Sequence, residues 1–141
     1  MTKQQFRNDL LANYTELKKY GTAKTKAAFF LPPYEWYNDS IAAWTKEMGL
    51  QLINFTPGTK STADYTTPDM KNYRSAEEIY QSIIGYEQGK TSGLNGFILL
   101  VHIGTDPGRT DKFYYKLPQL IQSLKVKGYQ FQTVNQLLKS D

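Results

Sequence analysis

The stretch FILLVHI at residues 97–103 decides the predicted fold class, since its first five positions form an apolar run that only residues 27–31 equal in length in the 141-residue chain. A nearly continuous apolar run of this length is typical of a strand that is covered on both faces of a sheet. Apolar runs at 27–31 and 50–55, and an alternating stretch at 129–134, indicate three more strands. We therefore expect four strands.

Helical patterns separate these strands. Phe6, Leu10, Tyr14 and Leu17 recur on one helical face, and Thr2 is placed to cap that helix. The predicted helices lie at 3–20, from Asn38 or Asp39 to Met48, from the capping box Ser75–Glu78 onward, at 112–127, and after a cap at Asn135. Because Pro118 falls near the start of the helix at 112–127, we expect either a first turn that is 3₁₀ or a start near Leu117. Alternating strands and helices predict an α/β fold with a mostly parallel four-stranded sheet and flanking helices, as one domain over residues 1–141.

Composition excludes several classes of protein. The chain has no Cys, so disulfides and thiolate metal sites are absent. Its net charge of +4 is scattered, whereas nucleic-acid binding needs clustered positive charge. No apolar run approaches the ~20 residues that cross a bilayer, and the N-terminal stretch has no apolar region of a signal peptide. We therefore expect neither a nucleic-acid nor a membrane partner.

The only His, His102, is the strongest candidate for chemistry. It ends the apolar strand and precedes a polar loop, and sites in parallel α/β folds lie at such strand ends. A neutral imidazole there could act as a general acid or base near pH 7, although a lone His is more often structural. The loop 56–74 is unusually long, as functional loops often are. The motifs of Ser hydrolases and of nucleotide-binding loops are absent.

Several stretches resemble the motifs of polysaccharide deacetylases, the NodB-homology family. FFLPPY at 29–34 resembles the third motif, LLVH at 99–102 resembles the fifth, and KGYQFQTVNQLL at 127–138 looks like the closing segment. SAEE at 75–78 is similar to the middle of the family domain, and HIGTDP at 102–107 looks like a bacterial branch. The resemblance covers only the C-terminal half of that domain, and it implies half of a distorted (β/α) barrel.

The resemblance implies metal-dependent hydrolysis of N-acetyl or O-acetyl groups on carbohydrate. It gives His102 the role of the acid that protonates the leaving amine, and it places Pro33 and Tyr34 in the wall of the substrate groove. We add Trp36, from the aromatic cluster beside them, and Asp106, from the loop after His102, as candidate substrate-binding residues.

The sequence also departs from the family pattern. The family's metal-binding Asp and its His-x-x-x-His pair lie upstream of these motifs and have no counterpart here, and Leu31 stands at the position of the third-motif Arg. The fourth motif has no clean match, although Asp64-Tyr65 lies in about the corresponding region. We expect no metal site in this chain, with a zinc-type divalent metal only in a complete family domain, and neither tight zinc binding nor deacetylation by this chain alone.

Three interpretations stay open: part of a deacetylase, a non-catalytic carbohydrate-binding or interaction module, and an α/β domain in which these motifs are structural. The expected ligand is a carbohydrate, and the family resemblance implies an extracytoplasmic location in a bacterium. An open sheet edge at 27–31, which carries Phe29 and Phe30, predicts a homodimer. If the helix at 3–20 covers that edge, we expect a monomer instead.

Overall fold

A computed structural model describes residues 1–22, 24 and 27–138. The sequence predicts a single domain, and the structure divides the chain into two compact units, Met1–Asn54 and Phe55–Asp141, which are described separately below. Among the described residues, no helix has both the length and the apolar character needed to cross a membrane.

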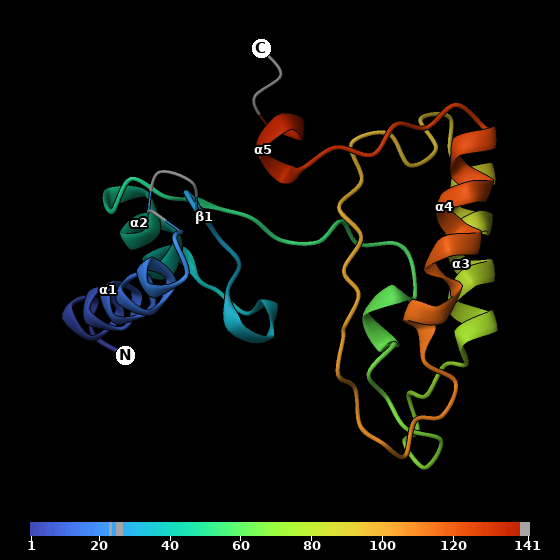
Figure 1. Ribbon diagram of the computed structural model, residues 1–141, viewed down its shortest axis with the longest axis horizontal. Helices are drawn as coiled ribbons and strands as arrows, with labels where there is room; N and C mark the ends of the chain where they lie inside the picture. Colours follow the sequence, from blue (N-terminus) through green and yellow to red (C-terminus); the bar gives the residue numbers. More distant parts are fainter. Residues whose placement is uncertain (23, 25–26, 139–141) are drawn as a thin grey trace. The chain divides into compact units, whose positions relative to one another are not determined.

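The first unit packs two helices against a short parallel strand pair (Figure 1). Its elements are α1 (Lys3–Lys19), β1 (Phe29–Phe30), the 3₁₀ turn η2 (Pro33–Glu35), α2 (Asp39–Glu47) and β2 (Gln51–Leu52). Phe29 pairs with Gln51, and Phe30 pairs with Leu52. Phe6, Leu10 and Leu50 are the buried centre of this unit, and the ring of Phe6 meets that of Phe30 edge-on with centroids 5.5 Å apart. Helix α1 therefore contacts β1, while self-association through this strand stays a prediction.

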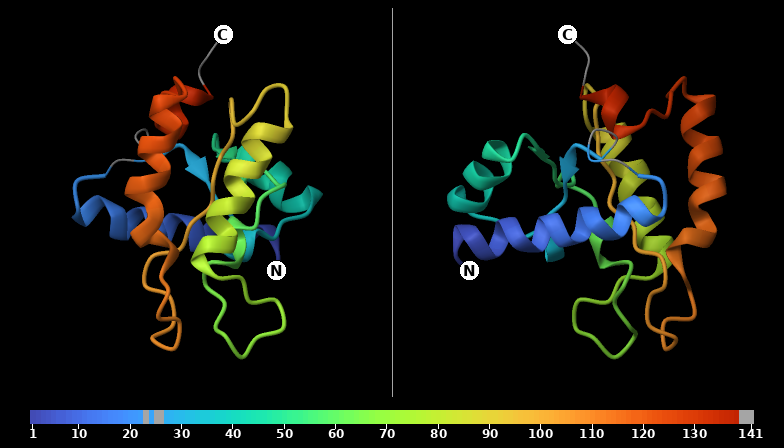
Figure 2. Two further views of the ribbon diagram at one scale, coloured as in Figure 1. Left: turned by 90° about the vertical axis from the view of Figure 1, so that its right-hand side faces the viewer. Right: turned by 60° about the vertical axis from the view of Figure 1, so that its left-hand side comes forward.

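The second unit is built on two helices that lie side by side, α3 (Ala76–Gly89) and α4 (Leu117–Val126) (Figures 1 and 2). Its other elements are the 3₁₀ turns η3 (Ser61–Ala63) and η4 (Phe113–Lys116) and the short helix α5 (Val134–Leu137). Ile79, Ile83, Phe113 and Leu120 are almost fully buried between these helices. The helix pair is thus the core of the unit.

The helix predictions are confirmed because their signals are local. Thr2 and Ser75 form capping boxes at the starts of α1 and α3, and the side chain of Asn38 caps α2. Pro118 lies in the first turn of α4, directly after the 3₁₀ turn η4. At the C-terminal end the prediction of Asn135 as a cap is wrong, because Thr133 caps α5 through a capping box with Gln136.

The predicted four-stranded parallel sheet, and with it the half barrel, is wrong. The described residues contain two strands of two residues each, both in the first unit, and they pair in parallel. Figure 2 draws residues 97–103 without a strand arrow. The one backbone–backbone hydrogen bond between this segment and the chain around Thr56, among those of the described residues, is at Ile98, whose carbonyl accepts from Thr56 N at 2.9 Å. Two residues after Thr56, Gly58 has a φ of 124°, so the neighbouring chain leaves the extended path and the ladder stops after one residue.

The stretch 129–134 fails as a strand for a different reason. The end of the stretch belongs to the start of α5. Thr133 caps this helix: its N–H donates to Gln136 Oε1 at 3.0 Å, and its Oγ1 accepts from Gln136 N. Gln130, Phe131 and Gln132 make no backbone hydrogen bond within the described part of the chain. The capping box therefore prevails over the alternating pattern, and a mainly helical structure replaces the predicted α/β sheet.

Candidate functional site

The structure pairs His102 with a buried carboxylate, that of Asp64. Nδ1 of His102 lies 2.6 Å from Asp64 Oδ1, and the backbone N–H of His102 donates to Asp64 Oδ2 at 2.7 Å. The Asp64 residue is 1% exposed, whereas the His102 side chain is 34% exposed. The carboxylate is thus withdrawn from water while part of the imidazole remains accessible.

This geometry fixes the orientation of the imidazole. Because the carboxylate accepts from Nδ1–H, the second nitrogen of the ring, Nε2, is left to exchange protons with other groups. The ring of Tyr65 packs edge-on against that of His102, with centroids 5.3 Å apart, and restrains it from one side. An oriented His with a buried carboxylate behind it is the arrangement of a general acid–base.

The long loop 56–74 supplies Asp64. The turn η3 brings Asp64 N to Ser61 O at 3.1 Å, and Ser61, Thr66 and Thr67 are buried along with the carboxylate. Threonine and serine side chains bond within this loop, as Thr66 Oγ1 does to Ala63 O at 2.6 Å. A loop that appears structureless in sequence is therefore packed around Asp64.

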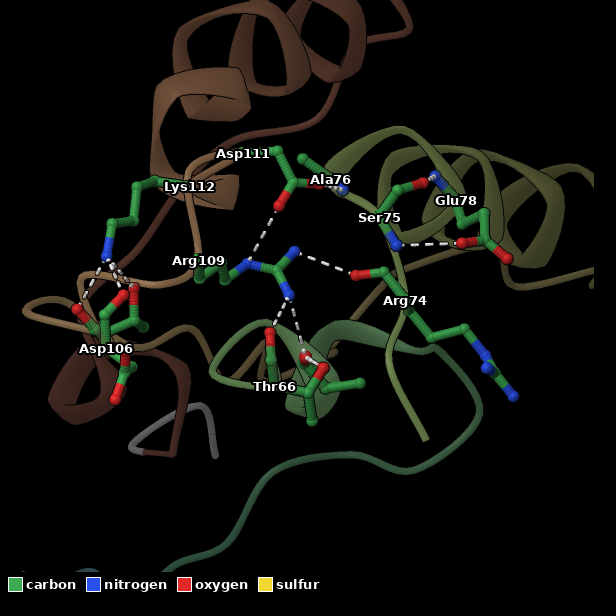
Figure 3. Close-up of polar contacts among 11 residues, drawn as sticks. Thr66, Arg74, Ser75, Ala76, Glu78, Asp106, Arg109, Asp111 and Lys112 are labelled. Atoms are coloured by element: carbon green, nitrogen blue, oxygen red, sulfur yellow. Dashed lines mark hydrogen bonds and ion pairs between the residues drawn. The ribbon is translucent and has the colours of Figure 1, made fainter. Parts of the chain in front are cut away.

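Arg109 holds this loop in place from inside the unit. Its side chain is fully buried, and Nη1 donates to Thr66 O at 2.7 Å while Nη2 donates to Arg74 O at 2.9 Å (Figure 3). Nη1 also lies 3.5 Å from Ala63 O. Because Ala63 and Thr66 flank Asp64, the guanidinium fixes the turn that carries the carboxylate.

A carboxylate compensates the buried charge of Arg109. Asp111 Oδ1 lies 3.6 Å from Arg109 Nε, and Asp111 Oδ2 accepts from Ala76 N at 2.7 Å, at the start of α3 (Figure 3). The guanidinium also lies over the ring of Tyr73, 5.2 Å from its centroid. Burial, and then the hydrogen bond with Asp111, raise the pKa of the Tyr73 phenol. These contacts stabilise the loop and leave the Arg109 side chain no exposed surface for a substrate.

Asp106, a predicted substrate-binding residue, stabilises its own loop. Its Oδ1 accepts from Gly108 N at 2.7 Å. Lys112 Nζ donates to the carbonyls of Thr105 at 2.7 Å and of Asp106 at 2.6 Å (Figure 3). Asp106 itself is exposed, so its second carboxylate oxygen can still meet a ligand.

The other predicted substrate-binding residues, Pro33, Tyr34 and Trp36, lie in the first unit. Tyr34 and Trp36 are 85% and 84% exposed. Tyr34 and Glu35 have φ values of 56° and 58°, in the left-handed region that non-glycine residues rarely adopt. Asn54, two residues after β2, donates from Nδ2 to Glu35 O at 2.9 Å and so holds the turn. Strained turns that are held by their surroundings are frequent at functional sites.

The described residues offer no metal centre. They contain no group of three or more His, Asp or Glu side chains close enough together to hold a metal ion. The residues of the Asp64–His102 pair therefore do not by themselves fit the metal site that the resemblance implies.

The sequence points to His102 but not to its partner. Asp64 lies in about the region of the expected fourth motif, and the signal that could identify it is its place in the unusually long loop 56–74. The sequence does not single out Arg109, because a charged residue in a polar loop is expected at the surface. No protein-family model matches this chain. A search of curated proteins likewise gives no match.

Proposed function

We propose that this chain provides the general acid–base group of a carbohydrate deacetylase, which hydrolyses N-acetyl or O-acetyl groups on a sugar. The observation that carries the proposal is the Asp64–His102 pair, with its carboxylate buried and its imidazole partly exposed. The motif resemblance around residues 29–34 and 99–102 supports the choice of substrate class. The proposed acid–base role rests on the Asp64–His102 pair alone.

The proposed step is a proton transfer. In deacetylation, water adds to the acetyl carbon, the bond from that carbon to the sugar nitrogen or oxygen breaks, and the leaving atom takes a proton. His102 first accepts at Nε2 the proton that the attacking water loses, and the resulting imidazolium then donates a proton from Nε2 to the leaving nitrogen or oxygen. Asp64 keeps Nδ1–H in place and stabilises the imidazolium between these transfers. Since the described residues do not fit a metal site, we assign no metal-dependent step to them.

Ligand titration tests the proposal. We would record the ring resonances of His102 by NMR while adding N-acetylchitotetraose, with cellotetraose as a control that has the same linkage but no acetamide. The single His of the chain makes the assignment unambiguous. We expect the acetylated sugar alone to shift these resonances. If both sugars have the same effect, or neither has any, the proposed substrate class is wrong.

A second candidate function is carbohydrate binding without catalysis, favoured by the exposed aromatics on the strained turn of the first unit. Tyr34 and Trp36 present flat apolar faces to solvent, as a sugar-stacking surface requires. The matched variants are Trp36→Ala and Tyr20→Ala, since Tyr20 is 83% exposed elsewhere in this unit. Loss of oligosaccharide affinity in Trp36→Ala alone, with the His102 resonances unmoved by sugar, would favour this function over the first.

A further inference from the structure

A cavity of about 710 Å³ opens in the second unit between α4, residues 97–101 and residues 129–137. Its walls are mainly apolar, with Leu99, Val101 and Phe131 among the residues that line it. The polar side chains of its wall are the amides of Asn95, Gln130 and Gln132 and the phenol of Tyr129, and no charged residue lines it. A ligand that fills this groove must therefore be uncharged where it is buried.

One wall of the groove carries backbone groups without partners. Ile98 uses both of its backbone groups on one side, because its N–H donates to Thr56 Oγ1 at 3.0 Å and its carbonyl accepts from Thr56 N at 2.9 Å. Successive residues of an extended chain direct these groups to opposite edges. Leu99 and Val101 thus face the edge away from Thr56, and within the described part of the chain their backbone groups have no hydrogen-bond partner.

Leu99 and Val101 are half-buried residues, and their unpaired backbone groups favour a ligand that can bond with them. Leaving such a group unpaired away from water is unfavourable, because it loses its bond to water and gains none in return. A purely apolar ligand such as an acyl chain would fill the volume but leave Leu99 and Val101 unpaired, whereas a peptide strand supplies donors and acceptors at the right spacing. The chemistry of the wall therefore selects a peptide.

The volume agrees with a short strand. With about 3.3 Å of rise per residue, about 4.8 Å between strands and about 10 Å between layers, a strand residue occupies roughly 160 Å³. The cavity of about 710 Å³ thus corresponds to about four strand residues. We propose that this groove binds an extended, uncharged peptide segment of another polypeptide, which adds as a strand along residues 97–101. The inference is independent of the proposed function, since neither Asp64 nor His102 lines the groove.

Amide hydrogen exchange tests the proposal with a blocked peptide, acetyl-Val-Thr-Val-Thr-Val-amide, as the probe. At a peptide concentration ten times Kd, we expect exchange at Leu99 and Val101 to slow by about tenfold. The control is the same peptide N-methylated at alternate residues, which cannot complete the ladder. No slowing at these two amides, or equal slowing by the methylated peptide, would overturn the proposal.

Two variants of α4 locate the binding surface. Ile121 lines the groove and is 36% exposed, whereas Val126 on the same helix is 77% exposed and outside it. Ile121→Lys places a charge in the uncharged groove and should weaken peptide binding at least about tenfold, while Val126→Lys should leave it unchanged. Equal affinities of the two variants would contradict the location. Slowing of Leu99 and Val101 at higher protein concentration without peptide would show that a second copy of the chain is the occupant, and would replace the proposal.

Discussion

Replacing Asp64 by Asn should invert the tautomer of His102. In the native pair Asp64 accepts two hydrogen bonds, from the His102 backbone N–H at 2.7 Å and from the imidazole at Nδ1, 2.6 Å away. An Asn has one oxygen for these two positions. If that oxygen keeps the backbone N–H, the amide NH₂ faces Nδ1 and donates to it, which requires the neutral imidazole to carry its proton on Nε2.

The same substitution should also lower stability. A hydrogen bond to a charged group contributes about 1.5–3 kcal/mol and a neutral one about 0.5–1.5 kcal/mol, so the loss is about 1–1.5 kcal/mol for each bond. Because both bonds to Asp64 become neutral, Asp64→Asn should lower the free energy of unfolding by about 2–3 kcal/mol. Nitrogen chemical shifts of the His102 ring report the tautomer, and urea denaturation reports the stability. The control is Asp69→Asn, an exposed carboxylate on the same loop. A His102 ring that keeps its proton on Nδ1 in Asp64→Asn would refute this reasoning.

Three further predictions concern the framework around the pair. Arg109→Gln should lower the free energy of unfolding by about 3–5 kcal/mol, because it leaves buried partners unpaired, and an unchanged urea midpoint would contradict the role of Arg109. The hydrogen bonds of Glu78 with Ser75, at the start of α3, lower the pKa of Glu78. The Glu78 carboxylate therefore stabilises the fold at pH values above its ordinary pKa of 4.5, and this stabilisation is lost as the pH falls through the lower pKa of the folded state. Glu78→Gln should flatten the acid side of a plot of unfolding free energy against pH, and a plot identical to that of the native protein would count against the capping box. Tyr34→Gly should be about 1 kcal/mol less destabilising than Tyr37→Gly, because only Tyr34 has a positive φ, and equal denaturation midpoints would show that the turn is unstrained.

The parts of the fold that could be predicted depend on local signals. Thr2 and Ser75 cap their helices through residues three positions away, so the sequence alone carries that information. A strand depends on a partner that is far away in sequence. The apolar run at 97–103 satisfies the composition of a strand, but the neighbouring chain leaves the extended path at Gly58, after a single backbone bond at Thr56.

In the candidate site, too, only the residue with a local signal could be predicted. His102 could be found because it is the only His and ends an apolar run, whereas its partner Asp64 is 38 residues away and comes from a loop without periodicity. Arg109 could not be predicted as buried, since its burial depends on the carbonyls of Thr66 and Arg74 being turned inward. Tertiary hydrogen bonds of this kind have no signature in composition or spacing.

Carbethoxylation of His102 by diethyl pyrocarbonate tests the central claim most directly. The reagent modifies an accessible imidazole nitrogen, and the chain has only one His. The measured quantity is the rate of modification with and without N-acetylchitotetraose. We predict modification at Nε2, because Nδ1 is held by Asp64, and a slower rate when the acetylated sugar is bound. Modification at Nδ1, or a rate that the sugar leaves unchanged, would contradict the assignment of His102 as the acid–base group of a carbohydrate site.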